Sequence, residues 1–327
     1  MFLTLLRHVS RAPSARARGC LGATGLGILR RIVKVIKSQP TVEGAGVRLH
    51  RAIGFSEPEV YDPFLLLDDF RSHRPDHYIK GFPWHPHRGI ETITYVLRGT
   101  VNHGDSMGNR GTIAPGDVQW MTAGRGIIHQ EMPKGDSDGA MHGFQLWANL
   151  PAAHKMMPPR YQEVLAAEIP EVTAPDGTVV KVIAGNYGGA AGPVRDIVID
   201  PLYLDIQMRP GSSFELPVTP GHTTLAYVIG GQAYFGTGDE TYSYPVAGVG
   251  YFDTDLPKFI ENGHLVLFGD GDLVRTTTED APARFLVISG RPIKEPIAWR
   301  GPIVMNTQEE LQTAFAELQD GTFLKQD

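Results

Sequence analysis

Short runs of apolar and β-branched residues recur along almost the whole chain, separated by turn-forming residues. Residues 47–53 (Val-Arg-Leu-His-Arg-Ala-Ile) alternate apolar and polar positions at period two, which is the pattern of a half-buried strand. Similar runs occur at 32–36, 92–97, 111–113, 118–121 and 141–150. Regularly spaced short strands favour an antiparallel sandwich or barrel over a doubly wound parallel sheet.

A second series of such runs begins near residue 197. Its members lie at 202–206, 223–229, 232–235, 249–252, 264–268 and 284–288. Residues 95–99 (Tyr-Val-Leu-Arg-Gly) in the first series match residues 227–231 (Tyr-Val-Ile-Gly-Gly) in the second. The match and the shared strand texture predict two copies of one β-barrel module. We place the first domain at 32–160 and the second at 161–327, with the connection at 151–159 and 170–176.

Only the C-terminal region has the pattern of a helix. Leu311, Phe315 and Leu318 share one face, and Gly321 follows as a stop. Asn306, with Glu309 three residues later, predicts a capping box at the start. We expect this amphipathic helix to pack on a barrel as a structural lid.

The charge of the 327-residue chain is unevenly distributed. The chain carries 30 basic and 36 acidic residues, a net charge of −6, which argues against a general polyanion binder and against direct contact with nucleic acid. Residues 1–42 hold eight of the basic residues and no acidic one, which leaves 22 basic against all 36 acidic residues from residue 43 onward. The body of the protein is therefore acidic and its start is basic.

We treat the basic start, residues 1–31, as a separate leader. Its arginine-rich, acid-free composition is typical of an organelle transit peptide, although a disordered extension or an unused upstream start codon gives the same composition. Its arginines are dispersed and do not form the compact cluster of a nuclear signal. No run reaches the roughly 18 apolar residues of a membrane span. We expect a soluble monomer, in the cytoplasm or in the mitochondrial matrix if the leader is a transit peptide, without membrane contact.

Two histidine pairs are the strongest chemical signal in the sequence. The chain has one cysteine, Cys20, so a metal would have to be held by histidine and carboxylate. His85-Pro86-His87 and His129-Gln130-Glu131 each place two potential ligands two residues apart, on one face of an extended segment. Folding the pairs together gives three histidines and one carboxylate, a set that suits Fe, Mn, Ni, Cu, Zn or Co and leaves positions open for substrate or dioxygen.

A single H-x-H pair arises often by chance, but two such pairs in turn-bounded β segments favour a metal site. His103 lies between the pairs and is a candidate pocket residue. Aligning Tyr95 with Tyr227 places the following residues at the four candidate ligand positions of the second module: Pro217, Thr219, Glu261 and Gly263. We therefore predict that the second barrel holds no metal. The other histidines default to solvated or core roles: His8, His50, His73, His77, His142, His154, His222 and His264.

Residues 85–92 (His-Pro-His-Arg-Gly-Ile-Glu-Thr) and the long segment 115–133 closely resemble the pirin family of the cupin superfamily. The resemblance extends through 62–64, 145–150 and 302–307, and so covers the chain from about residue 32 to its end. It implies an all-β bicupin, in which two jelly-roll β-barrels pack face to face and a short helix ends the chain. It also implies iron in the first barrel, Fe(II) or Fe(III), and none in the second.

In that family the metal ligands correspond to His85, His87, His129 and Glu131. Glu91 occupies the position of the glutamate ligand of general cupins, and we place it beside the ligands without contact to the metal. Further residues expected near the ligands or in the pocket are His103, Gln119, Met121 and Gln145. Aromatic and apolar residues flank the ligand segments, and we expect at least half of them in the barrel core: Trp84, Trp120, Met121, Phe144 and Trp147.

The resemblance suggests two functions. One is a dioxygenase similar to quercetin 2,3-dioxygenase, which opens a ring of a small aromatic substrate with dioxygen and releases carbon monoxide, with Glu131 accepting the proton of the substrate hydroxyl. The other is a non-enzymatic iron protein whose oxidation state controls binding to a transcription factor or a metabolic enzyme. We favour the dioxygenase.

Overall fold

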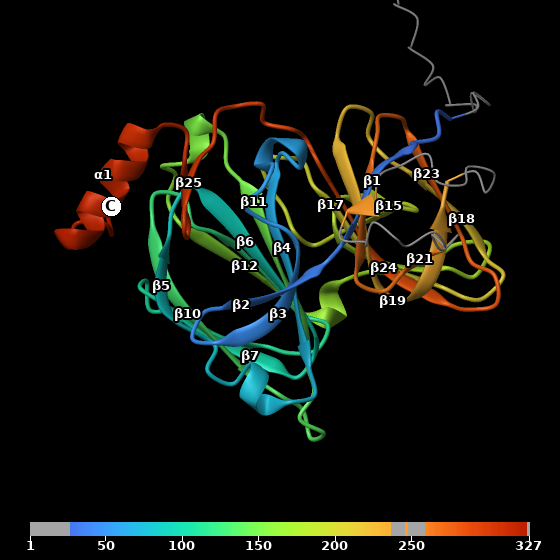
Figure 1. Ribbon diagram of the computed structural model, residues 1–327, viewed down its shortest axis with the longest axis horizontal. Coiled ribbons are helices and arrows are strands. Elements are labelled where there is room, and N and C mark those ends of the chain that lie inside the picture. The colour runs from blue at the N-terminus through green and yellow to red at the C-terminus, as the bar shows by residue number, and fades with distance from the viewer. Residues whose placement is uncertain (1–26, 237–245, 248–258, 326–327) are drawn as a thin grey trace, which may run out of the picture.

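Two β-barrels lie side by side in the computed structural model, which describes residues 27–236, 246–247 and 259–325 (Figure 1). The all-β architecture predicted from the strand pattern is confirmed. Residues 1–26 of the predicted leader, with Cys20 and His8, and the run predicted at 249–252 lie outside the described residues. The predictions for the leader, the cellular location and the monomeric state stay predictions. Within the described part of the chain, no helix is long and apolar enough to cross a bilayer.

The N-terminal barrel combines a seven-stranded and a four-stranded sheet. The first sheet has the order β12-β9-β6-β11-β4-β3-β2 and the second has the order β5-β10-β7-β8. The strands of the first sheet are β2 (Gln39–Glu43), β3 (Val47–Ile53), β4 (Phe64–Ser72), β6 (Ile90–Arg98), β9 (Val118–Thr122), β11 (Met141–Asn149) and β12 (Arg160–Val164). Those of the second are β5 (Phe82–His87), β7 (Thr100–Asp105), β8 (Arg110–Ile113) and β10 (Ile127–Lys134).

The C-terminal barrel repeats the central part of this arrangement. In the N-terminal barrel β11 pairs with both β4 and β6, and in the C-terminal barrel β24 pairs with both β17 and β19. The strands of its large sheet are β1 (Ile32–Lys37), β13 (Glu171–Thr173), β14 (Val179–Ala184), β17 (Leu202–Met208), β18 (Ser213–Pro217), β19 (Thr223–Phe235), β20 (Val246–Ala247), β21 (Ile260–Glu261), β22 (His264–Phe268), β23 (Leu273–Thr277) and β24 (Ala283–Gly290). Two small ribbons complete the strands: β15 (Asn186–Tyr187) with β16 (Ala190–Ala191), and β25 (Ala298–Arg300) with β26 (Ile303–Met305).

Both ends of the described chain cross to the other barrel. β1 lies inside the segment 32–160 that we placed in the first domain, but it pairs antiparallel with β22 of the C-terminal barrel. At the other end, the segment after β24 returns to the N-terminal barrel, where Ile303 of β26 bridges to Arg88. β12, which spans residue 160, pairs with β9 of the N-terminal barrel.

The interface between the barrels is apolar with two polar contacts of the same kind. One continuous buried cluster joins Tyr95, Trp120 and Phe144 to Leu225 and Tyr227. Within it, the Tyr95 hydroxyl donates to Asp205 of the other barrel at 2.7 Å, and the Tyr227 hydroxyl donates back to Asp69 at 3.0 Å. The two tyrosines that were matched in the sequence therefore make equivalent contacts across the interface.

The C-terminal helix α1 (Gln308–Gln319) is capped one residue later than predicted. The N-cap is Thr307, whose hydroxyl accepts from the Glu310 amide at 3.1 Å while the Glu310 carboxylate accepts from the Thr307 amide at 3.1 Å. The predicted capping box of Asn306 and Glu309 is thus wrong. The Asn306 side-chain amide donates to Glu295 at 3.0 Å, and its Oδ1, the oxygen that a cap would use, has no hydrogen-bond partner among the described residues.

His142 at the barrel interface gives a prediction for stability. Burial lowers its pKa from 6.5 to about 4, and the neighbouring Arg71 guanidinium acts in the same direction, whereas Asp69, 3.6 Å away, opposes it. A lowered pKa means that the unfolded chain binds a proton that the folded state excludes, so this stability is present above pH 6.5 and is lost as the pH falls towards 4. When the pH is lowered from 6.5 to 4.5, we expect the free energy of unfolding of metal-free wild type to fall by on the order of 2 kcal/mol more than that of His142→Gln.

Urea unfolding at several pH values measures this difference, with the exposed His73→Gln as the control variant. A constant gap between wild type and His142→Gln across the pH range contradicts the assignment.

Candidate metal centre

The three predicted histidine ligands converge on one point inside the N-terminal barrel. β5 and β10 pair antiparallel, with His129 opposite His85 and Ile127 opposite His87. Because side chains alternate along each strand, His85, His87 and His129 all face the barrel interior. One ring nitrogen from each lies within 4.8 Å of the others, so the structure brings the three histidines together, while their role as metal ligands stays a prediction.

The environment of these imidazoles suits metal ligands. His87 and His129 are 2% and 1% exposed, and burial lowers the pKa of both well below the usual value, so that the rings are neutral. A neutral imidazole is the form that binds a metal. Neither ring nitrogen of His129 has a hydrogen-bond partner among the described residues. Two orphaned buried nitrogens are costly in an empty protein interior, and a coordinated cation would satisfy one of them. The residues present therefore fit a bound metal ion.

Backbone carbonyls orient the other two rings. His85 Nδ1 donates to the Pro83 carbonyl at 2.8 Å, and His87 Nδ1 donates to the Pro302 carbonyl at 3.1 Å. Because a carbonyl only accepts, each Nδ1 carries the proton and each Nε2 keeps its lone pair. Such contacts from the unligated nitrogen are typical of metal-binding histidines.

Glu131, the predicted fourth ligand, lies in the same cavity. It is fully buried, and the Thr94 hydroxyl donates to its Oε1 at 2.7 Å. Burial raises the pKa of Glu131 to about 7, and the Thr94 contact opposes this shift. Glu131 is not part of the tight group of three histidines. The β5–β10 pairing is irregular between these two positions, because His129 lies opposite His85 whereas Glu131 lies opposite Phe82. The role of Glu131 as a ligand stays a prediction.

The remaining predicted site residues lie in different places in the structure. Gln145 lines the cavity. Glu91 lies on the opposite face of β6, where it accepts from the Thr122 hydroxyl at 2.7 Å. His103 is directly opposite Glu131 on β7, with its Nε2 3.1 Å from Glu163.

Gln119 and Met121 are fully buried; Met121 belongs to the apolar cluster that contains Ile127 of β10. Of the aromatic residues considered for the pocket, Trp84 and Trp147 line it, while Trp120 and Phe144 belong to the core between the barrels.

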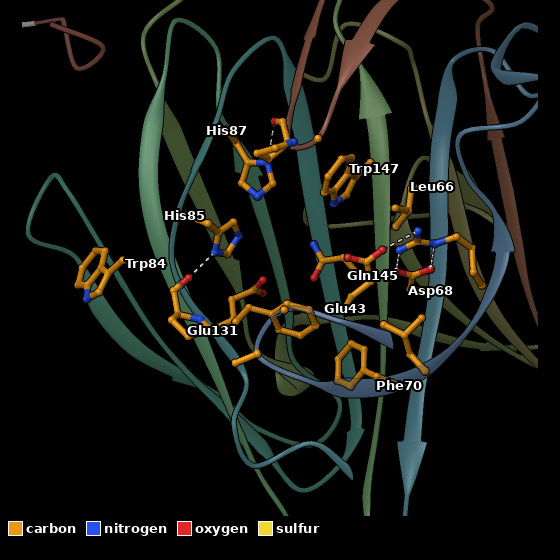
Figure 2. Close-up of a pocket in the computed structure, with 18 of the residues that line it drawn as sticks. Glu43, Leu66, Asp68, Phe70, Trp84, His85, His87, Glu131, Gln145 and Trp147 are labelled. Atoms are coloured by element: carbon orange, nitrogen blue, oxygen red, sulfur yellow. Dashed lines mark hydrogen bonds and ion pairs between the residues drawn. The ribbon is translucent and has the colours of Figure 1, made fainter. Parts of the chain in front are cut away.

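His85 and His87 line one side of a cavity of about 460 Å³. Figure 2 shows His85, His87 and Glu131 on one wall and Asp68, Leu66 and Phe70 on the opposite wall, with Gln145 and Trp147 between them. The Trp147 ring meets the His87 ring edge to face at 5.1 Å. Trp84 points away from this group in Figure 2 and is half exposed.

Sequence reasoning missed a charged group on the wall opposite the histidines. Arg51 donates to both carboxylate oxygens of Asp68 at 2.7 Å and to Glu43 at 2.9 Å. Burial raises the pKa of Asp68 to about 6 although Arg51 opposes the shift. The signal was present in the sequence, because Asp68 and Asp69 interrupt an otherwise apolar strand.

Comparisons with known proteins identify the family. The family model described as Pirin matches residues 46–148, and the model described as Pirin C-terminal cupin domain matches residues 203–324. The chain belongs to the pirin family. All four predicted ligand positions fall within the first match, and the bicupin architecture implied by the resemblance is confirmed.

Pirins from distant organisms are similar over nearly their whole length. A pirin-like protein of Caulobacter vibrioides is 43% identical over 296 residues, which cover 90% of this chain and 99% of that protein. Human pirin is 39% identical over 297 residues, with 90% and 94% coverage. Among solved structures, a quercetin 2,3-dioxygenase of Acinetobacter baumannii is 31% identical with a TM-score of 0.77, covering 90% of this chain and 98% of that one. A bacterial pirin of Escherichia coli in complex with nickel(II) is 18% identical with a TM-score of 0.57, a likeness that shows the shared fold alone.

Two buried glutamates allow a matched test of the fourth ligand. We expect Glu131→Gln to lower metal affinity by roughly tenfold or more, because it removes a ligand charge, and Glu91→Gln to leave the affinity within about twofold. Competition with a chelator, with metal content measured by mass spectrometry, gives both values. Weakened binding in Glu91→Gln with normal binding in Glu131→Gln would reverse the assignment.

Proposed function

We propose that this pirin is a metal-dependent dioxygenase that opens the ring of a flavonol or a related phenolic enediol. Iron is the proposed metal, held by His85, His87, His129 and Glu131. The observation that carries the proposal is the convergence of three imidazoles, two buried and that of His85 half-buried, beside a largely apolar cavity of about 460 Å³, within the usual size range of small-molecule sites. The likeness to a quercetin 2,3-dioxygenase of Acinetobacter baumannii supports it.

A bound divalent ion supplies Lewis acidity, which lowers the pKa of a substrate hydroxyl, and a redox couple for reaction with dioxygen. The chain supplies the acceptor for the hydroxyl proton. Oε1 of Glu131 is occupied by the Thr94 hydroxyl, so Oε2 is the oxygen that takes the proton. In the metal-free chain burial raises the pKa of Glu131 to about 7, so this carboxylate holds a proton more readily than an exposed glutamate does.

Apolar side chains shape the space for a flat ring. The cavity walls include Leu49, Leu66, Phe70, Phe82 and Trp147. These residues exclude water and offer faces against which an aromatic substrate stacks. The substrate is thereby held with its hydroxyl groups towards the histidines.

Oxygen uptake and carbon monoxide release with quercetin test the activity. We expect iron-loaded wild type to consume dioxygen and release carbon monoxide, and His87→Ala to lose both because a ligand is missing. The exposed His73→Ala, outside the cavity, is the matched control and should keep wild-type rates.

Product formation that persists in His87→Ala and in metal-free protein would refute a role of the metal site in turnover. Absence of turnover together with capture of a protein partner in only one oxidation state would favour the regulatory alternative instead.

The charged wall predicts which phenols bind. Asp68 and Glu43 place two carboxylates beside the single guanidinium of Arg51, so this end of the cavity favours hydroxyl donors and repels anions. The quantity to compare is the ratio of the affinity for catechol to the affinity for 3,4-dihydroxybenzoate. We expect this ratio to be about fivefold larger in metal-loaded wild type than in Glu43→Gln.

Calorimetric titration measures the two affinities in each variant, and comparing variants cancels the intrinsic difference between the ligands. Glu57→Gln removes the same charge outside the cavity and should behave as wild type. Equal discrimination by wild type and Glu43→Gln argues against this role of the wall.

A further inference from the structure

The metal centre depends on residues from the far end of the chain. The carbonyl that orients His87 belongs to Pro302, 215 residues later in the sequence. Pro302 directly precedes β26, so the position of this short strand determines the direction of the His87 ring. We name residues 302–323, which include β26 and α1, the C-terminal clamp.

Arg88, the residue after His87, ties the same point to α1. It is 2% exposed, and its Nη1 lies 2.7 Å from the Glu317 carboxylate. Its Nη2 donates to the Phe323 carbonyl at 2.9 Å, and its guanidinium lies 4.2 Å from the centre of the Phe323 ring. Neighbouring residues of the ligand segment are thus both held by the C-terminal clamp.

A buried lysine, Lys155, joins the backbone of the turn after His87 to the backbone of β26. Lys155 is 1% exposed, and its ammonium donates to the Gly89 carbonyl at 2.9 Å and to the Val304 carbonyl at 3.0 Å. The Val304 amide donates to the Arg88 carbonyl at 3.1 Å. Gly89 has a φ of +78°, and a Cβ there would lie 2.0 Å from the Val304 carbonyl oxygen, so only glycine allows the turn to approach the strand this closely.

The second ligand strand is also in contact with the C-terminal clamp. Ile128 of β10, the neighbour of His129, packs against the cluster that contains Ile303, Leu311 and Phe323. Figure 1 shows α1 on the outer side of the N-terminal barrel, beside β5. Both strands that carry the histidines therefore rest against the C-terminal clamp.

We propose that docking of the C-terminal clamp and metal binding are thermodynamically coupled, with Arg88 as the positioning residue that transmits the effect to His87. The proposal rests on the metal site of the proposed function. A docked clamp holds Nε2 of His87 towards the other two rings, and a released clamp leaves that ring free to turn. Linkage then requires that metal lowers the equilibrium constant for the opening of α1 by the same factor by which opening weakens metal binding.

Two variants separate the Arg88 contact from other contacts of α1. Glu317 pairs with both Arg88 and Lys325, at 2.7 and 2.6 Å. Glu317→Gln breaks both pairs, whereas Lys325→Gln breaks only the second. Glu309→Gln removes an exposed charge from the first turn of the same helix and controls for helix stability.

The experiment uses the full chain and Co(II) as the metal. Chelator competition gives the dissociation constant, the visible spectrum reports the ligand field, and hydrogen exchange of residues 308–319 with and without Co(II) reports the opening of α1. We expect Co(II) to slow exchange in wild type about tenfold, and Glu317→Gln to lose roughly tenfold in affinity and to show an altered spectrum. Lys325→Gln and Glu309→Gln should match wild type in all three measurements.

The failures are distinguishable. Normal Co(II) binding with unchanged exchange in α1, or equal loss of affinity in Glu317→Gln and Lys325→Gln, overturns the coupling and leaves the proposed function in place. A wild type that binds no metal overturns the metal centre itself, and the coupling with it. If Glu317→Gln is destabilised throughout, Phe323→Leu, which keeps the carbonyl contact but removes the ring from Arg88, provides the second comparison and should also weaken Co(II) binding.

Discussion

The alternation of side chains along antiparallel strands determines both the core and the site. On β6, Ile93 and Tyr95 point towards the second barrel, while Thr94 points into the first and meets Glu131. One strand therefore contributes to the packing between domains and to the chemistry within a domain. The same alternation on β5 and β10 collects three histidines inside the barrel, where burial keeps them neutral. Any slip of register by one residue would exchange these two faces completely.

Local spacing made the grouping of the three histidines predictable, because residues two apart on a strand lie on the same face. The same spacing could not place Glu91, because a turn at Arg88 and Gly89 separates it from His87. The alternation of side chains between two faces holds only within one continuous strand. Counting from Tyr95 instead would have placed Glu91 on the face towards the second barrel. The fold class followed from strand texture, whereas the exchange of β1 between barrels involves pairing between strands more than 200 residues apart, which no local pattern encodes.

The cavity illustrates a similar limit. Its aromatic residues were identified from their closeness to the ligand motifs, yet Trp120 and Phe144 belong to the interface between the barrels, while Arg51, Glu43 and Asp68 enter from strands β2 to β4. Charged residues inside an apolar strand such as β4 are the local sign of such a wall, since an isolated buried carboxylate would be too costly without the guanidinium. The helix cap shows the smallest error, one residue: the hydroxyl of Thr307, and not the side chain of Asn306, accepts from the first turn.

The crossing of both chain ends has a consequence for how the molecule comes apart. The N-terminal strand β1 completes the second barrel, and the segment after β24 completes the first, so each barrel is closed by sequence that borders the other. Separating the barrels by a cut between residues 160 and 161 would leave the first without the carbonyl that orients His87 and the second without β1, which lies between β22 and β20. The two domains share one pattern of strands, yet neither half of the chain contains all the strands of its own barrel.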